Sequence, residues 1–362
     1  MSEVDQQQQS GCRSWFRSTG APPAWGLVRY AACGLFAGAA LGAALPQVRG
    51  TLLAALAGVI VAAAGSGGPS RIARRVALLA AASGLVLTVV AFATGNRPVW
   101  AGLAMGAVAL LTSVMAAGGP LGGILGFLLS LGYMLVATMA RVANLFELVS
   151  LRWAAAHIAA GCIAGLIVVF VGTAWRRRSE PDEVKTASAP PLELRSMWES
   201  LRSFDEQARD GVRRAVPLAI LMFLFQREGG RDAFWIFFAA YLVLLTPGKA
   251  QKSLALTRVG ATLFGVLLLA FASLLIPDRV LFSFGIVILF AGIGLSPAYP
   301  VVGGGLTTIG SVLLAGAPTG GVGNWAERRL LDTALGCAIA LVATYLFWPR
   351  DRETKEPVPA PT

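Results

Sequence analysis

Residues Pro98 to Ala140 read PVWAGLAMGAVALLTSVMAAGGPLGGILGFLLSLGYMLVATMA and contain no Asp, Glu, Lys, Arg or His in 43 positions. A second uncharged stretch, Val280 to Ala326, covers 47 positions in the other half of the chain. Because about 20 apolar residues cross a bilayer as a helix, each stretch is long enough to cross twice. Gly and Pro interrupt each near its middle, at 118–120 and between 297 and 305. We therefore predict two hydrophobic hairpins at matching places in a duplicated, all-helical membrane protein.

The composition of the 362 residues is that of a membrane protein, with 56% hydrophobic residues, 14% charged residues and a mean hydropathy of +0.68. These values exclude a water-soluble domain. In a soluble protein the net charge of +11 would indicate nucleic acid as a partner, but here the basic residues lie between apolar segments, where they set membrane orientation. The four cysteines show neither a disulfide framework nor metal-ligand spacing, and the polar start, 1–18, does not resemble a cleavable signal.

Apolar runs between charged residues predict about twelve transmembrane helices. Two of them, at 50–65 and 233–246, are short for a straight crossing and could be re-entrant. The predicted spans are Trp25–Leu45, Gly50–Gly65, Ile72–Ala93, Val99–Ala116, Leu121–Ala140, Trp153–Trp175, Val212–Gln226, Ala233–Thr246, Leu254–Ile276, Val280–Leu295, Val301–Ala315 and Leu330–Trp348.

The distribution of basic residues predicts the orientation. With the amino end inside, and Arg29 left aside, 20 Lys and Arg fall on the cytoplasmic side and 9 on the other, so both termini are predicted to be cytoplasmic. The connection at 176–211 holds apolar residues at helical spacing among charges, which predicts an amphipathic helix on the membrane face or a partner-docking helix. The predicted parts are a polar tail (1–24), a six-helix membrane repeat (25–175), this basic linker (176–211), a second six-helix repeat (212–349) and a tail (350–362).

The two halves repeat one another weakly, at an offset of roughly 175 to 183 residues. Arg75 aligns with Arg258, and the run His157, Gly161, Cys162 aligns with Asp332, Gly336, Cys337. Six spans in each half is an even number, so both halves begin on the same side and are related by an axis along the membrane normal. We therefore predict two parallel repeats with the substrate path at their interface.

Four short patterns in the second half are informative together: FWIFF at 234–238 with Pro247, RVGAT at 258–262 with Gly265, RRLLDT at 328–333 with Gly336, and WP at 348–349. With them, about Asp232 to Arg350 resembles the fusaric acid resistance (FUSC) and aromatic acid exporter family. The resemblance implies an inner-membrane efflux protein for aromatic carboxylic acids or related toxic organic anions, driven by the proton gradient and sometimes paired with a periplasmic adaptor. Related plant proteins of similar layout conduct organic anions, so a passive organic-anion channel is the alternative.

Few ionisable residues fall at membrane depth, where each costs about 2.5 to 3.5 kcal/mol near the bilayer centre and needs a partner or a function. Asp332 follows Arg329 by three positions, on the same helix face. Asp332 is our candidate for the coupling proton, with Arg329 holding it ionised or binding the substrate carboxylate; a structural ion pair is the alternative. His157, the only histidine, is the second proton-coupling candidate, against a purely hydrogen-bonded role.

Other residues are candidates for binding the substrate anion. Arg258 and its repeat counterpart Arg75 can each offer a planar pair of donors to a carboxylate, or can extend to the membrane surface instead. Thr307 and Thr308 follow the glycines at 303–305, whose backbone N–H groups could hold an anion or could merely allow tight packing. Four aromatic residues could stack on an aromatic substrate or lie in lipid: Trp235, Phe237, Phe238 and Tyr241.

The sequence offers no catalytic set: it has one histidine, no paired carboxylates in the spans, no phosphate loop and no zinc spacing. We therefore expect no enzyme, no cofactor and no metal. The expected partners are membrane lipid and a small organic anion, and a periplasmic adaptor or a homo-oligomer stays open. A non-transporting scaffold is the second alternative, although charged residues inside two repeated bundles argue against it.

Overall fold

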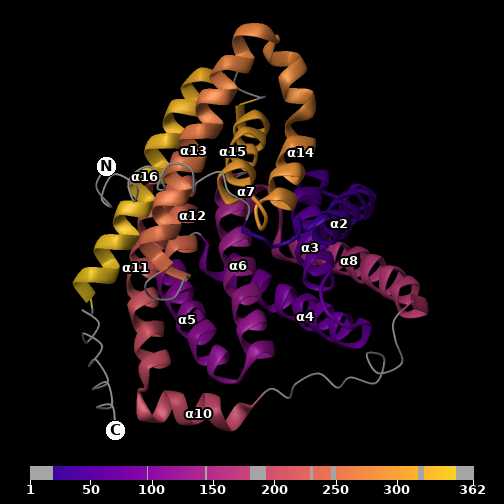
Figure 1. The fold of residues 1–362 in the computed structure, drawn as a ribbon. Coiled ribbons are helices and arrows are strands. Elements are labelled where there is room, and N and C mark those ends of the chain that lie inside the picture. The colour runs from indigo at the N-terminus through magenta and orange to yellow at the C-terminus, as the bar shows by residue number, and fades with distance from the viewer. Residues whose placement is uncertain are drawn as a thin grey trace, which may run out of the picture.

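The structure, a computed structural model, describes residues 19–95, 97–142, 145–179, 193–228, 231–245, 250–316 and 322–347. These residues form helices joined by short turns, and no β-strand occurs among them (Figure 1). The prediction of an all-helical fold is therefore confirmed for this part of the chain. Most of the two predicted tails and the middle of the linker lie outside the described residues.

The first half begins with α2 and ends with α8. α5 starts at Pro98, whose missing N–H is not needed in the first turn, and it ends at Ala117. Gly119 has a φ of +93°, which glycine adopts without strain, and the chain reverses there into α6. The elements are α2 (Trp25–Ala43), η1 (Val48–Gly50), α3 (Thr51–Ala64), α4 (Ser70–Thr94), α5 (Pro98–Ala117), α6 (Pro120–Val142), α7 (Leu145–Leu148) and α8 (Leu151–Ser179).

The second half follows the same order of long helices. Its elements are α10 (Leu194–Ser203), α11 (Glu206–Glu228), α12 (Arg231–Leu245), α13 (Ala250–Leu275), α14 (Asp278–Leu295), α15 (Pro300–Gly316) and α16 (Val322–Phe347). The helices extend into the predicted linker from both sides, because α8 continues past Trp175 and α11 begins before Val212. α10 lies in the linker where the amphipathic helix was predicted, with Leu194 and Trp198 exposed.

In the part of the chain that the structure describes, six helical segments are long and apolar enough to cross a membrane by length and composition. Large apolar side chains on them are exposed, such as Phe36, Val86 and Leu267, which suits contact with lipid. The chain is therefore a multi-pass membrane protein, while the number of twelve spans stays a prediction. The six segments are Trp25–Ala43, Ser70–Thr94, Pro98–Ala117, Leu121–Thr138, Leu151–Arg178 and Gln251–Leu275.

Six pairs of contacting long helices in the first half recur in the second half. In the first half α2 contacts α3 and α8, α8 also contacts α3 and α4, and α6 contacts α4 and α5. In the second half α11 contacts α12 and α16, α16 also contacts α12 and α13, and α15 contacts α13 and α14. When the long helices of each half are numbered in chain order, these six contacting pairs therefore match.

Glycines allow the closest of these helix contacts. A methyl group at Gly161 of α8 would collide with the backbone carbonyl of Ala54 in α3. A methyl group at Gly336 of α16 would likewise collide with the carbonyl of Ile236 in α12. The two glycines were aligned in the sequence repeat, and each lies where the sixth long helix of its half crosses the second.

Replacing Gly336 with Ala is expected to lower the free energy of unfolding by about 1–3 kcal/mol, because the added methyl group forces α12 and α16 apart. Thermal unfolding in detergent measures the loss. The matched control is Gly84→Ala in α4, where the nearest atom to the new methyl group would be Cys162 Sγ at 3.7 Å. Equal losses in the two variants would show that the close contact at Gly336 does not hold the helices together.

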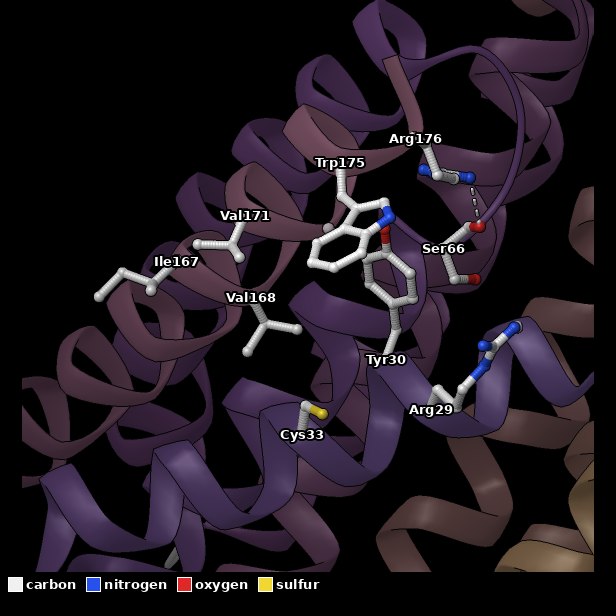
Figure 2. Close-up of a pocket in the computed structure, with 11 residues that line it drawn as sticks. Arg29, Tyr30, Cys33, Ser66, Ile167, Val168, Val171, Trp175 and Arg176 are labelled. Carbon is white, nitrogen blue, oxygen red and sulfur yellow. Dashed lines mark hydrogen bonds between the residues drawn. The ribbon is translucent and has the colours of Figure 1, made fainter. Parts of the chain in front are cut away.

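Two arginines attach the end of α8 to its neighbours. Arg74 of α4 donates a hydrogen bond from Nε to the Thr173 hydroxyl at 2.8 Å and lies over the Phe170 ring. Arg176 donates to the carbonyl of Ser66, in the turn between α3 and α4, at 3.0 Å (Figure 2). The end of α8 is thereby fixed against both α4 and that turn.

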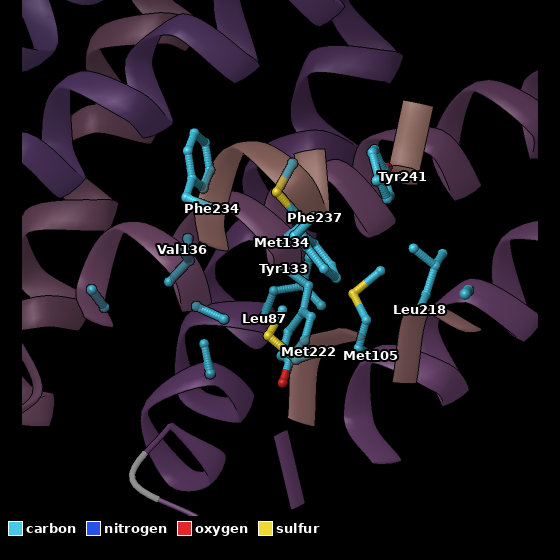
Figure 3. Close-up of a cluster of buried hydrophobic side chains, with 14 of the residues drawn as sticks. Leu87, Met105, Tyr133, Met134, Val136, Leu218, Met222, Phe234, Phe237 and Tyr241 are labelled. Carbon is cyan, nitrogen blue, oxygen red and sulfur yellow. The ribbon is translucent and has the colours of Figure 1, made fainter. Parts of the chain in front are cut away.

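The two halves share one hydrophobic core. Met105, Tyr133 and Met134 of the first half lie in the same cluster as Met222 and Phe237 of the second (Figure 3). The helix pairs that join the halves include α5 with α11 and α2 with α14. Each of these two pairs joins the fourth long helix of one half to the first of the other, so the two contacts correspond to one another.

Candidate functional site

A cavity of about 410 Å³ lies in the second half, enclosed by α12, α13, α15, α16 and the end of α14. Apolar side chains such as Phe238, Leu242 and Ile293 form part of its wall. Its described lining residues include no Asp or Glu, so the only formal charges on the wall are positive. The polar residues that line it are Thr257, Arg258, Thr262, Ser296, Thr307, Thr308, Arg329 and Thr333.

The two arginines come from different helices, Arg258 from α13 and Arg329 from α16, and lie close enough for their charges to repel. The Nε atom of each is buried and has no hydrogen-bond partner. Arg258 forms no hydrogen bond or ion pair with the described residues. Two partly buried guanidinium groups on one cavity wall leave positive charge and donors unsatisfied, which an anion in the cavity would relieve.

Arg329 is held in place from two sides. Its guanidinium carbon lies 3.7 Å from the centre of the Trp235 ring, a close cation–π contact. One terminal nitrogen donates to the hydroxyl of Thr333, one turn further along α16, at 3.3 Å. The planar group is therefore oriented by the protein before any ligand arrives, which suits two-pronged binding of a carboxylate.

The hydroxyl groups on the wall are already used as donors. Thr307 donates to the carbonyl of Gly303 at 2.7 Å, and Thr308 donates to that of Gly304 at 3.0 Å. Ser296 donates to the carbonyl of Gly292 at 2.8 Å. These hydroxyl oxygens therefore present lone pairs rather than hydrogens to the cavity unless they rotate, and they suit a donor group on a ligand, such as a phenol.

The glycines at 303–305 do not form the break that the sequence suggested. The second hairpin turns at 296–299, and the three glycines lie inside α15, where the N–H of Gly303 donates to the carbonyl of Tyr299 at 2.8 Å. They bring α15 close to its neighbours, since a methyl group at Gly304 would contact the side chain of Ala261 at 2.8 Å. Tight packing is therefore their role, and the hypothesis that their amides are free for an anion does not fit the structure.

The predicted aromatic residues of α12 divide into two groups. Phe238 lines the cavity, and Trp235 stacks under Arg329 next to it. Phe237 and Tyr241 point to the other side of the helix and are fully buried in the core shared by the two halves. The first two can contact a ligand or its binding group, whereas the other two are packing residues.

Asp332 is buried, 9% exposed, and lies close enough to Arg329 to interact with its charge. It does not belong to the described residues that line the cavity. Asp332 thus lies outside the described cavity wall but near enough to Arg329 to influence the charge that this arginine presents to the cavity.

His157 lies in the first half and does not line the cavity. It is fully buried, its Nδ1 lies 2.7 Å from the carbonyl of Trp153, and its ring packs against Gly50. Its Nε2 is buried without a hydrogen-bond partner. The structure therefore does not bring the two proton-coupling candidates, His157 and Asp332, to one cavity.

Arg75 is exposed on α4 and is not part of a site equivalent to that of Arg258. The inward-facing arginine on α4 is its neighbour Arg74, which binds Thr173. Sequence reasoning also missed Ser296 and Thr333 on the cavity wall. The spacing of four between Arg329 and Thr333 was the available signal, because residues four apart share a helix face.

Comparison with known protein families gives one match. The family model described as fusaric acid resistance protein-like matches residues 218–343, which contain every described residue of the cavity wall. The match confirms the resemblance seen in this segment of the sequence. Comparisons with curated proteins and with solved structures gave no match. The family and the apolar helices together indicate a multi-pass membrane transport protein.

Proposed function

We propose that this protein exports aromatic carboxylic acids across the bacterial inner membrane and binds them in the cavity of the second half. Arg258 and Arg329 bind the carboxylate, Phe238 contacts the ring, and the hydroxyls of Thr307 and Thr308 accept from polar substituents. The observation that carries the proposal is the pair of arginine Nε donors, buried and unpartnered, on a wall without described carboxylates.

The size and polarity of the cavity support a small, single-ring anion. Ligand pockets are typically about 300–1,000 Å³, mostly apolar and equipped with a few polar groups. At about 410 Å³ this cavity lies near the lower end of that range. A carboxylate bound by the arginines would use the polar part of the wall, and a ring packed against Phe238 would use the apolar part.

The corresponding helix pairs support the arrangement as two parallel six-helix repeats. The contacts of α5 with α11 and of α2 with α14 are the reciprocal contacts that a two-fold axis between such repeats would generate. With this arrangement and the excess of basic residues in the predicted inner connections, we place both termini in the cytoplasm.

Coupling to protons is the second part of the proposal, with Asp332 as the coupling group. Asp332 takes up and releases the coupling proton, and Arg329, whose charge interacts with that of Asp332, holds it ionised or binds the substrate carboxylate. Proton binding and anion binding at this place thus influence one another through a single guanidinium. His157 remains a second candidate because its Nε2 is buried and unpartnered.

A passive organic-anion channel is the alternative, and one observation favours it: Asp332 does not belong to the described cavity wall. An anion leaving a negative-inside cell gains about 2.3 kcal/mol per 100 mV, so export does not require proton coupling. Uptake of labelled hydroxybenzoate into proteoliposomes, with the membrane potential and the pH gradient imposed separately, distinguishes the two. Arginine-dependent flux supports the binding site in either case, and accumulation driven by pH alone supports the coupled transporter.

A further inference from the structure

A second cavity, of about 580 Å³, lies in the first half between α2 and α8, far along the chain from the arginine cavity (Figure 2). Its wall is largely apolar and includes Ile167, Val168 and Val171 of α8 and Cys33 of α2. Ile167 and Val171 are 55% and 64% exposed on a helix that is long enough to cross the membrane. We call this feature the α2–α8 groove; its apolar part opens toward the lipid side of the bundle.

One end of the α2–α8 groove is polar and basic. Arg29 is exposed there and forms no hydrogen bond or ion pair with the described residues, and Arg176 lies on the opposite wall. Arg176 directs its terminal nitrogens to the turn between α3 and α4 and lies over the ring of Tyr30, at 5.4 Å. Its Nε and the Tyr30 hydroxyl are buried without a partner. Three side chains thus bring donor groups to this end, and two of these groups are buried without a partner.

The described residues of the first half carry almost no negative charge. Residues 19–179 contain eleven arginines, no lysine and one acidic residue, Glu147. Glu147 precedes α8, whereas Arg176 lies near the end of that helix, roughly 38 Å away at 1.5 Å per residue. Arg177 and Arg178 follow directly. No carboxylate among the described residues of this half therefore lies near the basic end, and the positive charge there favours an anion.

Trp175 marks the boundary between the two parts of the groove. It is 76% exposed and lies on the groove wall one residue before Arg176 (Figure 2). Tryptophan is enriched at the level of lipid headgroups, where its ring meets acyl chains and its N–H meets water or phosphate. An exposed tryptophan between an apolar trough and a basic end is the pattern that an ordered phospholipid would match.

We propose that the α2–α8 groove binds one anionic phospholipid, with its phosphate at Arg29, Tyr30 and Arg176 and an acyl chain along Ile167 and Val171. This goes beyond the proposed transport function, because none of these residues lines the arginine cavity. A soluble anion would use the basic end but not the exposed apolar trough. The lipid fills both, and it joins α2 to α8 at the edge of the bundle.

The test uses the full chain in phosphatidylcholine vesicles that contain a small, varied fraction of phosphatidylglycerol with brominated acyl chains. Bromine quenches tryptophan fluorescence only in contact, and the difference between the native chain and Trp175→Phe isolates the signal of Trp175. We expect the Trp175 signal to be quenched at a lower lipid fraction by brominated phosphatidylglycerol than by brominated phosphatidylcholine. Equal quenching by the two lipids would overturn the proposal.

Arg29→Gln is expected to raise the phosphatidylglycerol fraction needed for half-quenching about fivefold, the effect of one basic residue at an anionic lipid surface. Arg29 is exposed and forms no hydrogen bond or ion pair with the described residues, so the variant isolates the charge. Arg97→Gln removes the same charge from an exposed residue beyond the far end of α4 and is expected to change nothing. Equal effects of the two substitutions would show a diffuse charge effect, and displacement of the lipid by free glycerol phosphate would show a soluble-anion site; either result contradicts the lipid site.

Discussion

Replacing Arg329 with Gln is expected to weaken binding of hydroxybenzoate by roughly 30- to 150-fold, equivalent to about 2–3 kcal/mol. The substitution removes one of two guanidinium groups on a wall whose described residues include no carboxylate, and the remaining Arg258 cannot supply a second pair of donors. Arg329 is oriented by Trp235 and Thr333, so its loss removes a preorganised contact. Equilibrium binding of labelled hydroxybenzoate to the purified protein measures the effect.

Two variants distinguish the loss of the Arg329 contact from a general change in the charge of the protein. Arg328→Gln removes the same charge one residue away, from an exposed side chain that does not line the cavity, and is expected to bind as the native chain does. Arg329→Lys keeps the charge but loses the planar pair of donors, so an intermediate loss is expected. If Arg328→Gln and Arg329→Gln weaken binding equally, net charge and not the cavity determines affinity.

Replacing Asp332 with Asn is expected to abolish accumulation of the anion driven by a pH gradient while leaving flux driven by the membrane potential. With one proton per anion, each pH unit supports about tenfold accumulation, since one unit corresponds to about 1.4 kcal/mol. In Asp332→Asn the side chain at position 332 stays neutral. The charge that Arg329 presents to the cavity is therefore the same whichever side of the membrane the cavity faces. Proteoliposomes clamped at zero potential, with an imposed pH gradient, measure the accumulation directly.

His157→Gln is the companion variant, because it removes the other titratable candidate without touching the cavity. Accumulation that survives Asp332→Asn but disappears in His157→Gln would assign coupling to the first half. Accumulation that survives both would rule out both groups, and the absence of pH-driven accumulation in the native chain would favour the channel.

The sequence alone predicted four of the residues that line the candidate site. Arg258, Arg329, Thr307 and Thr308 were selected from three separate helices, and all four line one cavity. This was predictable because each lies in an apolar helix where a polar group needs a reason to be present. The sequence could not show that they converge, since convergence depends on how α13, α15 and α16 pack.

The predictions for Arg75 and for the glycines at 303–305 do not fit the structure. For Arg75 the reason is that a shift of one residue changes the direction in which a side chain leaves its helix. Each residue turns a helix by about 100°, so Arg75 points outward while its neighbour Arg74 points inward to Thr173. The glycines at 303–305 read equally well as a chain break or as a packing surface, and the structure shows the latter. Composition gives no means of separating these readings, because glycine serves both uses.

If aromatic carboxylates cross the membrane through the arginine cavity, their flux depends on Arg329, and the most direct test is flux of labelled hydroxybenzoate through proteoliposomes at a fixed membrane potential. We predict carboxylate-specific flux by the native chain and by Arg328→Gln, reduced at least tenfold in Arg329→Gln, with no flux of the uncharged methyl ester above that of protein-free vesicles. Equal flux by Arg329→Gln and the native chain would contradict the account, because it would place the path of the anion elsewhere in the protein.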